Sequence, residues 1–149
     1  MERVVKFRGK TQDGKWVYGD LIHSGSDEIA ILEFDAPCLE AVTDVVPESV
    51  GQFTGLHDKN GEEIYEGDVA RNKEVGGYGF EYVGVVRYYE EDARFGIDVT
   101  ATSKISKRVL FSVGERCIND GYCTIKYTNE YEVIGNIHDN PNLLNDGND

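Results

Sequence analysis

Basic residues are missing from two long stretches of this 149-residue sequence. No Lys or Arg occurs between Trp16 and Asp58, and none follows Tyr127. The formal net charge is -13. A field of this sign repels nucleic-acid phosphates, so we interpret the acidic stretches as solvated faces of a soluble protein and expect no nucleic-acid partner. A surface that imitates the DNA backbone is the alternative interpretation.

Cysteine is scarce, and long apolar runs are missing. The three cysteines, Cys38, Cys117 and Cys123, include no pair with the two-residue spacing of a zinc knuckle or a redox pair. We therefore expect reduced thiols. The first residues lack the apolar centre of a signal peptide, and no apolar run approaches the ~18 residues of a membrane span. These absences predict a protein of the host-cell cytoplasm without membrane contact.

The sequence lacks the motifs of the common catalytic sites. Gly-x-Ser-x-Gly, His-Glu-x-x-His and phosphate-loop signatures are absent, and His23, His57 and His138 lie in or beside turns. We expect no catalytic residue, cofactor or metal. One remote alternative is a carboxylate- or metal-dependent enzyme, because four acidic residues could gather in space: Glu63, Glu66, Asp68 and Glu132.

Proline is also rare, with three residues against 17 glycines, and turn residues recur about every ten positions. This pattern predicts a mainly β protein with little helix. The expected strands cover 4–8, 16–22, 29–34, 39–46, 52–56, 62–65, 69–72, 81–89, 95–100 and 132–137. The range 39–46 also fits a short helix. We expect a short turn at 140–144 and a frayed tail at 145–149, and the ranges 73–79 and 101–127 show no clear period.

The densest local pattern is VGQFTGLHDKNGEEIYEGDV, residues 50–69. Gly55 suggests a bulge or a close backbone approach, and Asn60-Gly61 is typical of a tight hairpin turn in left-handed conformations. Glu66-Gly67-Asp68 predicts a second turn, fixed by the Asp68 side chain. Each special residue has a structural role, so we interpret the segment as architecture rather than as a catalytic site.

This segment resembles the central signature of the YopX family of phage and prophage proteins. FRGKTQDGKWVYGDLI near the start is similar to the family's N-terminal hairpin, and EVIGNIHDNPNLL is similar to its closing strand. The three pieces follow the family's order and span nearly the whole chain. The candidate signature and interaction residues are Gln52, Thr54, Gly55, Asp58, Gly61, Tyr65, Glu66, Gly67, Asp68, Gly135 and Asn136.

The resemblance implies an N-terminal β segment over 1–48, a C-terminal barrel-like (SH3-like) β domain over 49–144, and a phage or prophage origin. It implies no known reaction. We therefore predict a non-enzymatic protein that acts by self-association into a homo-oligomer or by binding a host or phage protein. The range Val4–Phe7 is predicted to be an open strand edge that pairs between chains. An accessory role with nucleic acid is the alternative, through a weak basic patch formed by Lys104, Lys107, Arg108 and Arg116.

Overall fold

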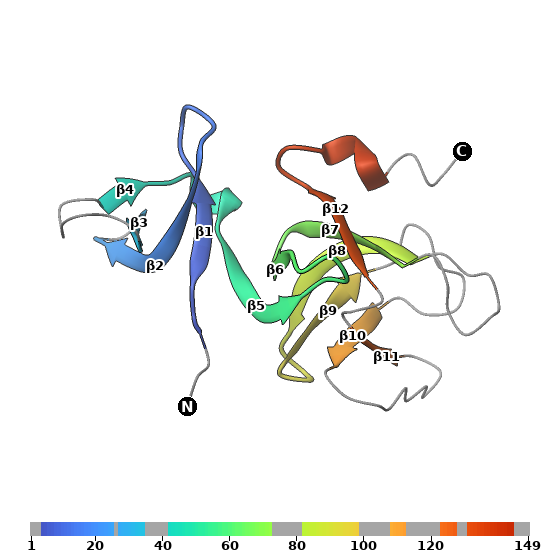
Figure 1. Cartoon of the computed structure of the whole chain (residues 1–149). Helices are drawn as coiled ribbons and strands as arrows, with labels where there is room; N and C mark the ends of the chain where they lie inside the picture. Colours follow the sequence, from blue (N-terminus) through green and yellow to red (C-terminus); the bar gives the residue numbers. More distant parts are fainter. Residues whose placement is uncertain are drawn as a thin grey trace. The chain divides into compact units, whose positions relative to one another are not determined.

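The fold was described from a computed structural model, which covers residues 4–25, 27–34, 42–72, 82–98, 108–112, 123–127 and 131–144. The chain divides into two compact units, Met1–Gly55 and Leu56–Asp149. Both units are built from strands, and helix in the described residues is limited to the 3-10 turns Pro47–Ser49 and Pro141–Leu144. The prediction of a mainly β protein is confirmed (Figure 1).

The first unit contains β1 (Phe7–Lys10), β2 (Trp16–Ser24), β3 (Glu28–Glu33), β4 (Val42–Asp44) and most of β5 (Gly51–His57). β1 to β4 pair in succession as an antiparallel meander. β5 pairs with the other edge of β1. Of the predicted strand 39–46, residues 42–44 form β4. The first sheet has the order β4-β3-β2-β1-β5-β6, in which β6 (Glu63–Tyr65) belongs to the second unit.

β1 is an internal strand, so the prediction of an open edge is wrong at Phe7. Phe7 pairs with Gly19 on β2 and with Gln52 on β5. Before it, the carbonyl oxygen of Lys6 accepts a hydrogen bond from the Phe53 amide at 2.9 Å. The signature segment itself supplies β5 and thereby occupies this edge. β5 and β1 lie far apart in the sequence, and the local pattern of apolar and turn residues does not indicate which distant strands pair.

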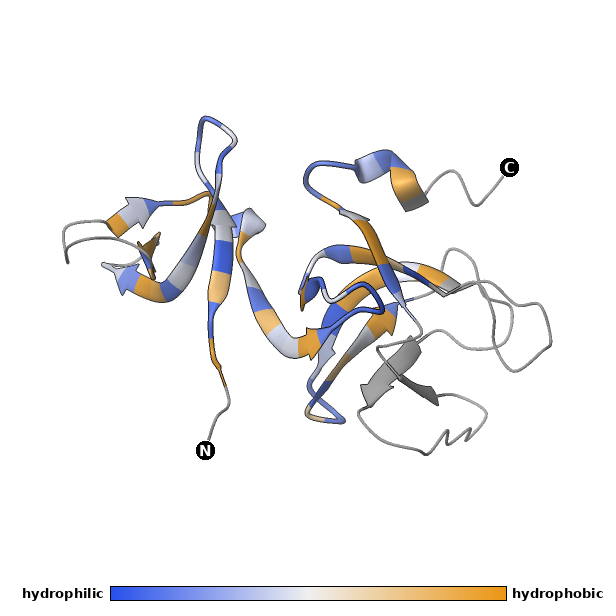
Figure 2. Cartoon of the chain, in the orientation of Figure 1, coloured by the Kyte–Doolittle hydropathy of each residue, from blue (hydrophilic) through white to orange (hydrophobic). Residues whose placement is uncertain are grey.

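The core of the first unit lies on one face of its sheet. Val17, Ile31 and Val45 are buried there, with Phe7, Leu21, Ile29 and Val50 packed against them. Buried Ser49 closes this core: its hydroxyl accepts a hydrogen bond from the Lys10 amide at 2.7 Å and donates to the Val46 carbonyl at 2.6 Å. The alternation of polar and apolar residues that places them is visible along the strands (Figure 2).

The second unit contains β7 (Asp68–Asn72), β8 (Tyr82–Tyr89), β9 (Arg94–Asp98), β10 (Arg108–Ser112), β11 (Cys123–Tyr127) and β12 (Glu132–Asn136). They form the sheet β11-β10-β9-β8-β7-β12. β8 and β9 overlap the predicted strands 81–89 and 95–100, and they pair as an antiparallel hairpin. β10 and β11 pair in parallel, which the sequence did not indicate.

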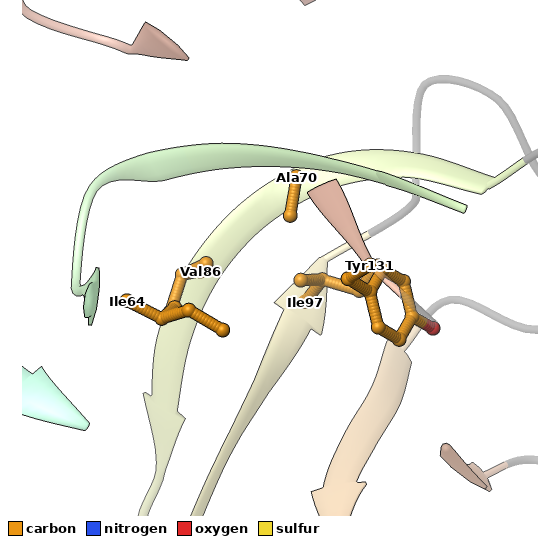
Figure 3. Packing of buried hydrophobic residues seen from close by; sticks show 5 residues of the cluster. All are labelled: Ile64, Ala70, Val86, Ile97 and Tyr131. Carbon is orange, nitrogen blue, oxygen red and sulfur yellow. The ribbon is translucent and has the colours of Figure 1, made fainter. Parts of the chain in front are cut away.

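The core of the second unit joins residues that lie far apart in the sequence. Ile64, Ala70, Val86, Ile97 and Tyr131 are buried together, and Figure 3 shows their side chains converging from β6, β7, β8, β9 and the residue before β12. Leu56, Phe95 and Val133 pack against them. Because Tyr131 precedes the last strand, this core cannot be complete until the end of the chain has returned.

The described strands of the second unit do not close into a barrel, so that part of the fold prediction is wrong. Its sheet order ends at β11 on one side and at β12 on the other. The turn that follows β5 covers the outer edge of β12 and forms a hydrogen bond there: the Lys59 amide donates to the Tyr131 carbonyl at 2.9 Å. A turn that covers an edge satisfies its polar groups without another strand.

Candidate functional site

Asp58 organises the first turn of the signature segment. Its side chain is only 5% exposed, and its Oδ1 accepts hydrogen bonds from the Asn60 amide at 2.8 Å and the Glu62 amide at 2.9 Å. Its Oδ2 accepts a third from the Val133 amide on β12 at 2.9 Å. A buried carboxylate is tolerated when it is hydrogen-bonded in this way. Asp58 therefore fixes its own turn and attaches it to the last strand.

The backbone of this turn differs from the prediction at one residue. The Gly61 amide donates to the Asp58 carbonyl at 3.0 Å, and Gly61 has a φ of 83°. Among the described residues only Ala93 combines a side chain with a positive φ, so Asn60 is not left-handed. The arrangement corresponds to a type I turn followed by a left-handed glycine. Asn60 instead contributes its amide to Asp58.

The second turn joins β6 to β7 and is fixed by Asp68. This carboxylate is 2% exposed, and its Oδ2 accepts a hydrogen bond from the Tyr65 amide at 2.8 Å. Gly67 has a φ of 88°, which a side chain disfavours. Its amide donates to the Val86 carbonyl at 3.0 Å, and its carbonyl accepts from the Ile137 amide at 2.9 Å. Both backbone polar groups of this one residue thus hold two other segments in place.

The closing strand meets both turns. β12 pairs with β7, with a register shift between Val133 and Gly135. A Cβ on Gly135 would lie 2.5 Å from Asn140 Oδ1 and 2.7 Å from Leu143 Cδ1, so glycine allows the terminal 3-10 turn to approach. Asn136 then forms its own turn, in which its Oδ1 accepts from the His138 and Asp139 amides at 2.9 and 2.8 Å.

The remaining signature residues lie beside these turns. Gln52 and Thr54 are half-buried on β5, and Gly55 is exposed, with a φ of 84° and nothing near the position of a Cβ. Tyr65 is buried, and its hydroxyl donates to Glu63 Oε1 at 3.2 Å. Glu66 is half-buried in the second turn. The hydrogen bonds of the signature carboxylates are those that a structural role requires.

The structure does not gather the four acidic residues of the enzyme alternative. Glu63 contacts Tyr65 and Asp68 binds a backbone amide, whereas Glu132 Oε2 lies 3.1 Å from Arg71 Nη2 and 3.8 Å from Lys59 Nζ. Within the described ranges, no group of three His, Cys, Asp or Glu side chains is arranged to hold a metal ion. Two nearby cations already neutralise Glu132, which disfavours a role as a metal ligand.

The predicted basic patch falls outside what the structure describes. Lys104, Lys107 and Arg116 lie outside the described residues, and for Arg108 only the backbone, in β10, is described. The patch therefore stays a prediction.

Sequence reasoning missed a surface on the first unit. The face of its sheet opposite the core carries Tyr18, Leu32 and Val42, because Leu32 pairs with Asp20 and Val42, and Tyr18 lies two residues before Asp20. Tyr18 is 44% exposed and Val42 45%. Phe34, 50% exposed, donates its amide to the Tyr18 carbonyl at 3.3 Å. We call Tyr18, Leu32, Phe34 and Val42 the outer apolar patch.

The sequence did contain a signal for this surface. The first four residues of IAILEF are all apolar, which indicates a strand with apolar residues on both faces. Trp16 belongs to the same face, where its ring lies under the Arg8 guanidinium at 4.7 Å. Because Arg8 is buried against this ring, the β1 end of the face is covered by a cation and the β2–β4 end is left apolar.

No helix in the described part of the chain is long and apolar enough to cross a membrane. The comparison with curated proteins found no match. Among solved structures, the chain is similar to the crystal structure of protein EF1440 from Enterococcus faecalis, at 25% identity and a TM-score of 0.47, over 95% of this chain and 98% of that one.

The family comparison agrees with the three sequence pieces whose contacts are described above. The family described as YopX protein matches residues 6–145, which include the N-terminal hairpin, both signature turns and the closing strand. The match covers nearly the whole sequence, and the chain therefore belongs to the YopX family.

Proposed function

We propose that this YopX-family chain is a non-enzymatic interaction protein whose function is to contact other polypeptides, either a host or phage protein or further copies of itself. One observation carries the proposal: three large apolar side chains of the first unit, Tyr18, Phe34 and Val42, are each about half exposed on or beside one sheet face. Clustered exposed apolar residues mark interaction sites more often than scattered ones do.

The signature residues support this proposal indirectly. A catalytic carboxylate must be free to meet substrate, whereas Asp58 and Asp68 are buried and accept hydrogen bonds from backbone amides. The two carboxylates of the signature segment thus stabilise the second unit through hydrogen bonds. A surface for partners then has to come from elsewhere in the chain.

The test is capture of a partner followed by reconstitution. Tagged full-length protein is incubated with host lysate, with and without nuclease, and each captured protein is then purified and titrated against the chain. We expect a complex that survives nuclease treatment and re-forms from two purified proteins. Loss of the complex with nuclease would favour the nucleic-acid alternative.

Self-association is measured on the purified chain alone. Because the net charge of -13 opposes association of identical copies, an oligomer should become more stable with added salt, which screens charge beyond about 10 Å at 0.1 M. Sedimentation at ~50 and ~500 mM NaCl straddles that range. A monomer under both conditions, together with no reconstituted complex, would overturn the proposed function.

A further inference from the structure

The outer apolar patch has an acidic border. Leu32 on β3 pairs with Asp20 on β2 and with Val42 on β4. Two residues further along β3, Ala30 pairs with Ile22 and Asp44, and beyond it Glu28 pairs with Ser24. Cross-strand partners project from the same face, so Asp20 and Asp44 lie beside the apolar residues, and Glu28 lies on the same face beyond Ala30. All three carboxylates are exposed, and none has an ion-pair partner among the described residues.

Three cations lie on the same face, Lys6, Arg8 and Lys10, and none of them forms an ion pair with the border carboxylates. Lys6 Nζ lies 5.0 Å from the centre of the Phe53 ring. Arg8 is buried against the Trp16 ring, and Lys10 Nζ lies 5.8 Å from the centre of the same ring. β2, β3 and β4 contain no Lys or Arg at all. The apolar centre is therefore bordered on its β2–β4 side by uncompensated negative charge.

Resting on the proposed function, we propose that the outer apolar patch binds a segment of a different protein in which apolar side chains alternate with Lys or Arg. The apolar side chains of that segment cover Tyr18, Leu32, Phe34 and Val42, and its cations lie against Asp20, Glu28 and Asp44. Complementary charge of this kind steers encounter and selects the partner.

The negative charge favours a basic segment over a second copy of the chain, nucleic acid or anionic lipid. A second copy docked through the same face would bring two sets of these acids together, and each copy already carries a net charge of -13. Phosphates of nucleic acid and of anionic lipid are repelled for the same reason. A homo-oligomer of this chain would consequently use another surface.

The experiment uses full-length protein and a synthetic probe peptide that alternates Lys with Val. Two matched peptides carry Glu in place of Lys, or Ser in place of Val. Affinity is measured by calorimetry, and the binding surface is mapped from the amide shifts of isotope-labelled protein. We expect binding of the Lys/Val peptide alone, with the largest shifts on β2, β3 and β4.

Variants then separate the patch from general attraction between opposite charges. Tyr18→Ser with Val42→Ser should weaken the affinity at least about tenfold. Tyr88→Ser, which removes a side chain 45% exposed on the second unit, should leave it unchanged. Asp20→Asn with Asp44→Asn should also weaken binding, more than Glu90→Gln with Asp92→Asn at the exposed β8–β9 turn. Thermal melting of every variant verifies that it is folded.

Two results would overturn the inference. One is peptide binding that the Tyr18/Val42 variant and the Tyr88 variant weaken equally, because the attraction would then be unspecific. The other is a dimer of the protein alone that the Tyr18/Val42 variant abolishes, which would make a second copy the occupant. The latter result would leave the proposed function intact. Conversely, if no protein complex or oligomer can be reconstituted, the proposed function is refuted, but a peptide site that has been mapped on the patch is not.

Discussion

The two units of this chain satisfy their buried polar groups in different ways. In the first unit, strands β1 to β4 pair with their sequence neighbours, and neutral Ser49 bonds the segment before β5 to Lys10. In the second, two buried carboxylates bind backbone amides, and one of them, Asp58, reaches across 75 positions to Val133. The second unit therefore depends on side-chain anchors that no neighbouring strand can replace.

The largest expected effect comes from Asp58→Ala. The substitution leaves three backbone amides without their acceptor, those of Asn60, Glu62 and Val133, and hydrogen bonds to charged groups contribute about 1.5–3 kcal/mol each. We expect a loss of at least about 3 kcal/mol in the free energy of unfolding, confined to the second unit. Hydrogen exchange resolved by residue measures it.

The matched control for that substitution is Asp92→Ala, at an exposed turn of the same unit. It should change the stability by less than about 0.5 kcal/mol. Equal losses for the two variants would show that Asp58 is not an anchor.

Gly67→Val tests the second anchor. The φ of 88° disfavours any side chain, and valine, branched at Cβ, should strain the backbone at a residue whose amide and carbonyl both hold neighbouring segments. We expect a loss of more than about 1 kcal/mol by urea unfolding. A variant with the same melting temperature as the parent would refute the turn assignment. The control is Gly25→Val, at a glycine of positive φ in the first unit, which should leave the stability of the second unit unchanged.

Ser49→Ala is the corresponding change in the first unit. It removes a neutral hydroxyl that accepts from the Lys10 amide and donates to the Val46 carbonyl. We expect a loss of about 1 kcal/mol, smaller than that for Asp58→Ala because no charge takes part. Hydrogen exchange should place the effect in β1 and β5. An effect as large as that of Asp58→Ala would remove the contrast between the units.

The smallest effect concerns Asp13, in the exposed turn between β1 and β2. The Thr11 hydroxyl donates to its carboxylate, and this bond, followed by a backbone hydrogen bond, holds the pKa of Asp13 below its ordinary value of 3.8. Folding thus favours the ionised form, so its contribution to stability is present above that value and is lost as the pH falls through the folded pKa. Thr11→Val should raise the pKa of Asp13 in an NMR titration, and an unchanged titration would show that the hydroxyl has no influence.

The strands were largely predictable because their signals are local. Alternating apolar residues and turn residues predicted the strands on both sides of Gly14 and of Glu90–Ala93, and in both places the two strands pair as a hairpin. The two signature turns were predictable from Gly61 and Gly67, which have positive φ in the structure. Asp68 was correctly expected to bind a nearby amide, since its partner Tyr65 lies three residues away.

What could not be predicted depends on pairs that are distant in the sequence. No local rule indicated that β5 would occupy the edge of β1, that β10 and β11 would pair in parallel, or that Asp58 would bind Val133. The outer apolar patch was missed for a related reason. Tyr18, Leu32 and Val42 share a face only through the register of three strands.

The sequence by itself determined that the chain is mainly β, where its tight turns lie, and to which family it belongs. These properties follow from the conformational limits of single residues and from the period of short segments. Tertiary structure decided which strands are neighbours, which carboxylates become anchors and which apolar side chains remain exposed. Those outcomes depend on which distant segments the chain brings together, because a residue's burial and hydrogen-bond partners come from the strands that pack beside it and not from its neighbours in sequence.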